Sequence, residues 1–375
     1  MIRLYCCYCL SLRRSFHRSV ILLSIFGVFL FQSEKSHAQH RSQSAHYFEA
    51  DHPYIQYAGR IDFTNPKLPR FWQPGVYITI RFAGSACRIV LNDEMLWGKN
   101  HNYLEVILDG RAVRLQTKAK RDTITVSDNL SAGIHTLIIC KNTEANIGYL
   151  EFVSIRCHQL VKPIPKPSRK IEFIGNSITC GAGSDLSGIP CGKGVWHDQH
   201  NAWLSYGPVT ARALNARYHL SAVSGIGLMH SCCNMDIIMP QVFDKISMRN
   251  DTINWNFKNY QPDVVTVCLG QNDGIQDSAI FCDNYISFVK RLRSFYPGAM
   301  IICLSSPMAD ASLTAFMKKV LTAVVSKINN EGDKRVSHYF FSKQYNNGCD
   351  YHPDLAEHQQ IAKELTAFIK KTMKW

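Results

Sequence analysis

The sequence lacks a hydrophobic run long enough to cross a membrane, and beyond its Pro-rich segment and its C-terminus it lacks any dense run of basic residues. Its longest apolar run, VILLSIFGVFLF at residues 20–31, falls short of the roughly 20 residues that a spanning helix needs. The net charge is +13, but Lys and Arg are dispersed and no nucleic-acid-binding motif is present. We therefore expect neither a membrane span in the mature protein nor a nucleic-acid partner.

The sequence also lacks internal repeats, low-complexity tracts and a recognisable metal-binding motif. Four histidines, at positions 197, 200, 352 and 358, follow no zinc-site spacing. We expect no metal and no cofactor.

The N-terminal segment is typical of a secretory signal. Arg13, Arg14 and Arg18 precede the apolar run, and the small-residue stretch SHA at residues 36–38 follows it. We predict cleavage of residues 1–38 and a secreted or periplasmic protein; a membrane anchor is the alternative. That segment holds five Lys/Arg and one Glu, so the remainder would carry a net charge of +9.

Cleavage would leave 11 of the 14 cysteines, an odd number, so at least one thiol is free or pairs with another chain. Cys180 and Cys349 lie three residues from Ser177 and His352, and export permits a disulfide between them. The adjacent pair Cys232 and Cys233 is expected to remain as buried thiols.

Two regions of different character follow the signal. Residues 45–160 contain short runs rich in β-branched and aromatic residues, with an Asp109-Gly110 hairpin signal between two of them. This predicts a β-sandwich. Residues 161–169 contain Pro163, Pro165 and Pro167, which forbid a helix and predict an extended linker.

From residue 170 to residue 375, strand-like and helix-like segments alternate, which predicts a parallel sheet covered by helices on both faces. The expected strands are residues 171–174, 218–223, 263–269, 300–304 and 336–341, and the expected helices include 278–295, 312–329 and 354–373.

Four polar or glycine-rich loops follow strands of this sheet, and function gathers at the carboxyl ends of parallel strands. They contain Ser177, Gly225, Asn272 and His352. A serine hydroxyl needs a base such as His352, and Asp350 could fix the tautomer of that histidine. The N–H groups of Ser177 and Gly225 and the amide of Asn272 could stabilise an oxyanion.

Each of these signals has a plainer interpretation when taken alone. Ser177 could cap a helix, Asn272 could belong to a turn, and His352 could lie at a helix start. The occurrence of all of them, in this order and each at a strand end, favours an acyl-transfer site.

The blocks GNSIT, SGIG, GQND and DYHP resemble those of the SGNH (GDSL-type) hydrolases, and over nearly the whole mature chain the sequence resembles carbohydrate esterase family 2. The resemblance implies an N-terminal jelly-roll domain and a C-terminal three-layer α/β hydrolase domain with a flavodoxin-like parallel sheet. It implies a secreted serine esterase that deacetylates polysaccharides such as xylan, mannan or glucomannan. It places the family's site residues on Ser177, Gly225, Asn272 and His352.

The sequence departs from the common SGNH pattern in two places. Asn176 stands where the pattern has Asp, and Cys349 stands three residues before His352, where the pattern has an acid. Some members of the resembled family use a Ser–His dyad helped by a backbone carbonyl, so Asp350 is a third catalytic residue only if its carboxylate holds His352.

Two tryptophans, Trp196 and Trp203, lie between the first two blocks and are predicted to contact sugar rings, with core packing as the alternative. The competing functions are an SGNH esterase acting on lipid or on another acetylated glycan, and a carbohydrate-binding protein with an inactive site.

Overall fold

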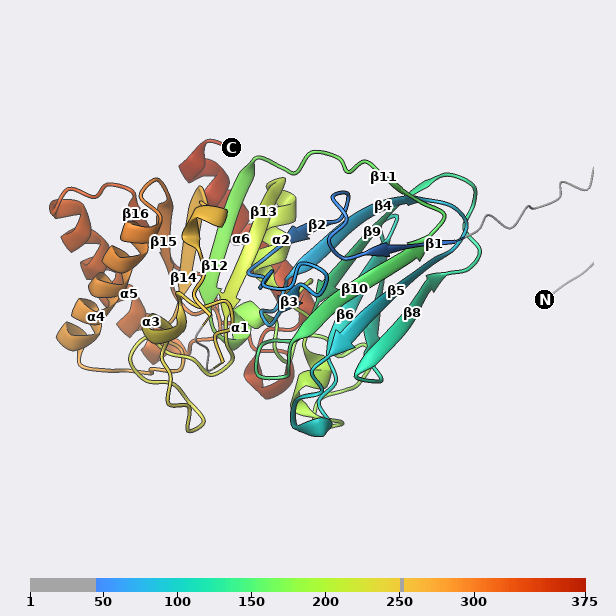
Figure 1. The fold of residues 1–375 in the computed structure, drawn as a ribbon. Helices are drawn as coiled ribbons and strands as arrows, with labels where there is room; N and C mark the ends of the chain where they lie inside the picture. The colour runs from blue at the N-terminus through green and yellow to red at the C-terminus, as the bar shows by residue number, and fades with distance from the viewer. Residues whose placement is uncertain (1–44, 250–252) are drawn as a thin grey trace, which may run out of the picture. The chain divides into compact units, whose positions relative to one another are not determined.

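The computed structural model describes residues 45–249 and 253–375 (Figure 1). The predicted signal, residues 1–38, lies outside the described residues. No helix in those two ranges has the length and apolarity needed to span a bilayer.

The N-terminal region forms two antiparallel sheets, as the alternating apolar pattern predicts. The first sheet has the order β1-β10-β5-β8, with β3 paired to β10, and the second has the order β11-β4-β9-β6-β7, with β2 paired to β4. Alternate residues of β4, such as Ile78, Ile80 and Phe82, are fully buried in a shared apolar core. The strands are β1 (His46–Glu49), β2 (Gln56–Ala58), β3 (Arg70–Phe71), β4 (Tyr77–Ala83), β5 (Cys87–Asp93), β6 (Tyr103–Leu108), β7 (Arg111–Gln116), β8 (Arg121–Ser127), β9 (Ile134–Lys141), β10 (Leu150–Cys157) and β11 (Gln159–Val161), with a short helix η1 (Leu96–Gly98).

The hairpin between β6 and β7 turns at the predicted dipeptide. Asp109 has φ 49° and Gly110 has φ 82°, the left-handed geometry of a two-residue hairpin turn. Aspartate and glycine tolerate this geometry better than most residues, which is why the pair is a strong sequence signal.

The C-terminal region contains a five-stranded parallel sheet with the order β13-β12-β14-β15-β16 (Figure 1). Its strands are β12 (Arg169–Gly175), β13 (Ala216–Ala222), β14 (Val264–Cys268), β15 (Met300–Leu304) and β16 (Val336–Tyr339). Its helices are α1 (Ser177–Cys180), η2 (Trp196–Gln199), α2 (Tyr206–Ala213), α3 (Met239–Val242), η3 (Phe257–Asn259), α4 (Ser278–Phe295), α5 (Ala311–Asn330), η4 (Cys349–Tyr351) and α6 (Leu355–Met373).

Helices cover both faces of this sheet, because its strands carry apolar side chains on both sides. Val265 and Val267 of β14 pack with α4 and α5 in one apolar cluster. Val264 and Cys268 of the same strand pack with α2 and α6 in another. The predicted fold class, an N-terminal β-rich domain and a C-terminal three-layer α/β domain, is confirmed.

Buried contacts join the two sheet regions, and the described residues belong to one compact unit. Arg60 of the N-terminal region donates to Glu172 of β12 at 2.7 Å, with both side chains fully buried. The predicted linker, residues 161–169, overlaps the end of β11 and the start of β12. Its role as a domain boundary stays a prediction.

Candidate active site

Ser177 lies where β12 gives way to a helix. The cap of α1 is Asn176, whose Oδ1 accepts a hydrogen bond from the Ile178 N–H at 3.2 Å, so Ser177 is the first helical residue rather than the cap. This accounts for asparagine in the GNSIT block, because Asn caps helices as well as Asp does. The N–H of Ser177 is one of the helix N-terminal groups that α-helical bonding leaves without a partner.

His352 follows the short helix η4 and contacts the serine directly. Its Nε2 lies 2.8 Å from Ser177 Oγ, and its Nδ1 lies 3.1 Å from the backbone carbonyl of Cys349. Burial lowers the pKa of His352, while the Cys349 carbonyl and the charge of Asp350 oppose that effect. The imidazole is therefore neutral at neutral pH and able to accept a proton.

Asp350 lines the same cavity as Ser177, but it is exposed and sits in the left-handed region with φ 51°. The partner that the structure gives to Nδ1 of His352 is the Cys349 carbonyl. A third catalytic role for Asp350 stays a prediction.

The loop after β13 brings Gly225 to the cavity in a left-handed conformation, φ 82°. Asn272, in the loop after β14, lines the same cavity and donates through Nδ2 to the Ile226 carbonyl at 2.8 Å. An amide nitrogen carries two hydrogens, so this bond leaves one for an oxyanion.

Asp273, directly after Asn272, has a role that was not predicted from the sequence. Its carboxylate accepts from three consecutive backbone N–H groups, those of Leu228, Met229 and His230, at 2.6–2.9 Å. These bonds fix the chain that follows Gly225. The only local sign of this role in the sequence is that an acid directly follows Asn272 in the GQND block.

The cavity around these residues has a volume of about 530 Å³. Trp196 lines it, is half exposed, and meets His200 edge to face at 4.3 Å between ring centroids. Trp203 is different: it is 9 % exposed, lies beneath the guanidinium of Arg212 and packs in a cluster with Ile107 and Cys140. The expectation that Trp203 contacts substrate is thus corrected to core packing between the two sheet regions.

The sequence left open whether Cys180 and Cys349 form a disulfide, and in the structure they do not. Cys349 pairs with Cys191, whereas Cys180 is a buried free thiol. Cys232 and Cys233 are bonded to each other and line the cavity, rather than being buried thiols. Within residues 45–249 and 253–375, no cluster of three or more His, Cys, Asp or Glu residues could hold a metal ion.

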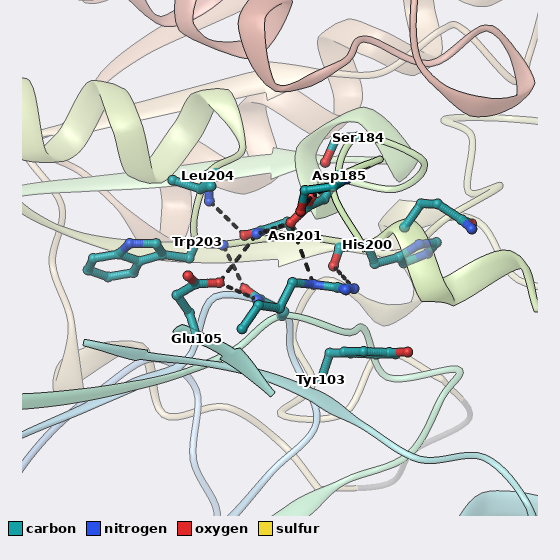
Figure 2. A network of polar contacts seen from close by, with 12 residues as sticks. Tyr103, Glu105, Ser184, Asp185, His200, Asn201, Trp203 and Leu204 are labelled. Atoms are coloured by element: carbon teal, nitrogen blue, oxygen red, sulfur yellow. Dashed lines mark hydrogen bonds and ion pairs between the residues drawn. The ribbon is translucent and has the colours of Figure 1, made fainter. Parts of the chain in front are cut away.

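The segment 181–205, which carries Trp196 and His200, rests on the β-sandwich through a polar network (Figure 2). Asn201 Nδ2 donates to Glu105 of β6 at 3.3 Å and to Asp185 at 2.9 Å. Tyr103 donates through its hydroxyl to the Asp198 carboxylate at 2.9 Å. The sandwich therefore supports one wall of the site.

A serine and a histidine in hydrogen-bond contact at the carboxyl edge of a parallel sheet, with a glycine and an asparagine beside them, define a hydrolase of the GDSL-like type. Comparison with known families agrees: residues 57–167 match the model described as "Carbohydrate esterase 2 N-terminal", and residues 173–355 match the "GDSL-like Lipase/Acylhydrolase family".

Several related proteins align with most of the chain. A family two carbohydrate esterase from Clostridium thermocellum, solved in complex with cellohexaose, is 30 % identical and superposes with a TM-score of 0.78 over 86 % of this chain and 99 % of its own. The "Acetylxylan esterase / glucomannan deacetylase" of Cellvibrio japonicus is 28 % identical over 92 % of this chain and 96 % of its own length. The "Cellulase/esterase CelE" of Acetivibrio thermocellus is 31 % identical over 87 % of this chain, which spans 40 % of that relative's length. The chain belongs to carbohydrate esterase family 2.

Proposed function

We propose that the protein is a serine esterase that removes O-acetyl groups from polysaccharides through an acyl-enzyme. The observation that carries the proposal is the 2.8 Å contact between Ser177 Oγ and His352 Nε2 at the wall of the cavity. Nucleophile and base are already in hydrogen-bond contact, as the first step requires.

In the proposed reaction, Ser177 Oγ attacks the acetyl carbonyl while His352 Nε2 takes the hydroxyl proton. The carbonyl of Cys349 holds the Nδ1–H and so keeps the correct tautomer during this transfer. The tetrahedral oxyanion accepts hydrogen bonds from the N–H groups of Ser177 and Gly225 and from the Asn272 amide.

The intermediate collapses when His352 returns the proton to the sugar oxygen, which leaves as a hydroxyl. Water, deprotonated by the same histidine, then attacks the acetyl-serine. His352 returns that proton to Ser177 Oγ as the acyl–Oγ bond breaks, so the serine is regenerated and acetic acid leaves and ionises to acetate. Charge and atoms balance with no cofactor. In this proposal the Asp350 charge favours the imidazolium through space, and the Cys349 carbonyl is the orienting group.

The choice of substrate is supported by the relatives and by the cavity. Two are named for acetylxylan and glucomannan, and the solved relative holds a cellohexaose chain. In this chain Trp196 offers a half-exposed aromatic face to a sugar ring beside the serine. Since such polymers do not enter cells, we propose that the protein acts outside the cytoplasm, secreted or periplasmic.

The test is acetate release from acetylated xylan, glucomannan and peptidoglycan by the wild-type protein and by Ser177→Ala and His352→Ala. Both variants should keep the fold and lose nearly all turnover, since the two residues act as a unit. A serine-directed organophosphate should label Ser177. Faster hydrolysis of long-chain than of acetyl p-nitrophenyl esters would instead indicate a lipid esterase, and polysaccharide binding without acetate release would indicate an inactive binding protein.

A further inference from the structure

A loop of the β-sandwich, residues 142–149 between β9 and β10, reaches the candidate active site. Asn146 of this loop lines the same cavity as Ser177. Glu144 lies behind it, fully buried, and its Oε2 accepts a hydrogen bond from the backbone N–H of Ser224 at 2.5 Å. Ser224 directly precedes Gly225. A carboxylate of the β-sandwich therefore binds the backbone of the loop that would form the oxyanion hole of the α/β domain.

Glu144 is held rigidly in this position. The buried Nζ of Lys141 donates to the backbone carbonyls of Thr143 at 2.6 Å and of Glu144 at 3.1 Å. The Thr143 hydroxyl donates to Asn102 Oδ1 at 2.6 Å, which ties the loop to the sandwich. Because Glu144 is fully buried and its backbone is anchored, its carboxylate can hold a hydrogen-bond partner at a fixed position, which a mobile exposed side chain could not do.

The charge on Glu144 is retained despite its burial. Burial alone would raise the pKa of Glu144, but the neighbouring imidazole of His200, whose Nε2 lies 3.7 Å from Oε1, and the hydrogen bond from the Ser224 N–H hold that pKa below its usual value. A hydrogen bond to an ionised acceptor is roughly twice as strong as one between neutral groups. The Ser224 N–H therefore has a strong, directed partner.

Other hydrogen bonds hold the loop after β13 at Gly225 and beyond it. The Gly225 carbonyl accepts from the Cys232 N–H at 2.8 Å, and the Ile226 carbonyl accepts from the Asn272 amide at 2.8 Å. Glu144 supplies the contact on the preceding residue. Oxyanion donors accelerate acyl transfer only if they are aimed before the reaction begins, so a shift of this peptide would cost rate rather than substrate affinity.

We infer that Glu144 is a positioning residue for the oxyanion hole, and that the β-sandwich thereby completes the catalytic site of the α/β domain. This inference rests on the proposed esterase chemistry at Ser177. It predicts that changing Glu144 lowers kcat while leaving KM nearly unchanged.

The experiment uses the full chain with Glu144→Gln and Glu144→Ala, assayed for kcat and KM on p-nitrophenyl acetate and acetylated xylan. Loss of one oxyanion donor typically costs on the order of a hundred- to a thousandfold, so Glu144→Ala should lose up to about a hundredfold in kcat. Glu144→Gln keeps an acceptor oxygen without the charge, and should recover part of that loss, to within about tenfold of wild type.

Glu151→Gln is the matched control. Glu151 is a buried carboxylate of the same domain, 7 % exposed, that accepts from Arg70 at 2.6 Å and from Asn92 at 2.9 Å within the sandwich. It should lose thermal stability and keep wild-type kcat. Thermal denaturation of every variant separates loss of fold from loss of rate, and Glu144→Gln serves if Glu144→Ala does not fold.

The inference is overturned if both folded Glu144 variants keep wild-type kcat, if they raise KM alone, or if Glu151→Gln loses kcat as severely as Glu144→Gln. Failure of the proposed function has a different signature, in which the wild-type protein releases no acetate or Ser177→Ala remains active.

Discussion

Replacing Asp350 by asparagine tests whether a carboxylate or a carbonyl orients the catalytic histidine. In a full triad, this change lowers kcat by roughly ten-thousandfold. Here the Nδ1 of His352 lies 3.1 Å from the Cys349 carbonyl, and Asp350 is exposed. The substitution would remove only a solvent-screened charge, worth at most about 1 kcal/mol. That corresponds to a fall in kcat of about fivefold or less.

The pH dependence gives a second, independent readout. The negative charge of Asp350 favours the imidazolium and so raises the pKa of His352, against the lowering effect of burial. Asp350→Asn removes that opposition and lowers the pKa further. Because the neutral imidazole is the base, activity is lost as pH falls through this pKa, and the acid limb of kcat/KM should move to lower pH.

The assay is steady-state hydrolysis of p-nitrophenyl acetate across pH 4–9, with Asp354→Asn as control. Asp354 lies on the same segment, but its carboxylate caps α6 by accepting from the Glu357 N–H at 2.8 Å, and asparagine caps equally well. The control should match wild type. A thousandfold loss of kcat in Asp350→Asn, or an acid limb displaced to higher pH, would refute a carbonyl-oriented dyad.

Three further substitutions probe the disulfide, the buried ion pair and the oxyanion donor. Cys191→Ala removes the bond that holds Cys349, the source of the orienting carbonyl, and should lower kcat about tenfold at unchanged KM, as steady-state kinetics would show. Arg60→Ala leaves the Glu172 carboxylate buried without its cation and should cost about 3–5 kcal/mol in urea unfolding; a loss below 1 kcal/mol would mean that the site admits water. Asn272→Ala should lower kcat on the order of a hundredfold or more while organophosphate still labels the serine; wild-type kcat would exclude Asn272 from the oxyanion hole.

The fold and the order of the site blocks were predictable because both depend on short-range pattern. Strands such as β15 and helices such as α4 were predicted to the residue, since runs of apolar β-branched residues and amphipathic periodicity identify them locally. Polar loops at the carboxyl ends of parallel strands must share one edge of the sheet, so Ser177, Gly225, Asn272 and His352 could be expected together.

Residues that act across long stretches of chain were not predictable in this way. Cys349 pairs with Cys191 over a sequence separation of 158, and no spacing rule connects them. Glu144 belongs to another domain and reaches the oxyanion loop through the backbone N–H of Ser224, a contact that leaves no mark in the sequence around the active-site blocks. The sequence does not distinguish Trp203 from Trp196, because both are tryptophans in the same segment. Only the tertiary packing under Arg212 places Trp203 in the core.

The distribution of thiols has a consequence for how this protein must be produced. Seven cysteines in the described residues are free, six of them buried, and burial raises the pKa of Cys140, Cys268 and Cys303 to about 12. In the folded protein these thiols are almost never ionised, so they do not exchange with the two disulfides. An unfolded chain in an oxidising medium exposes all of them at once. Production should therefore favour rapid folding before oxidation, and denaturation without reductant should be irreversible through scrambled disulfides.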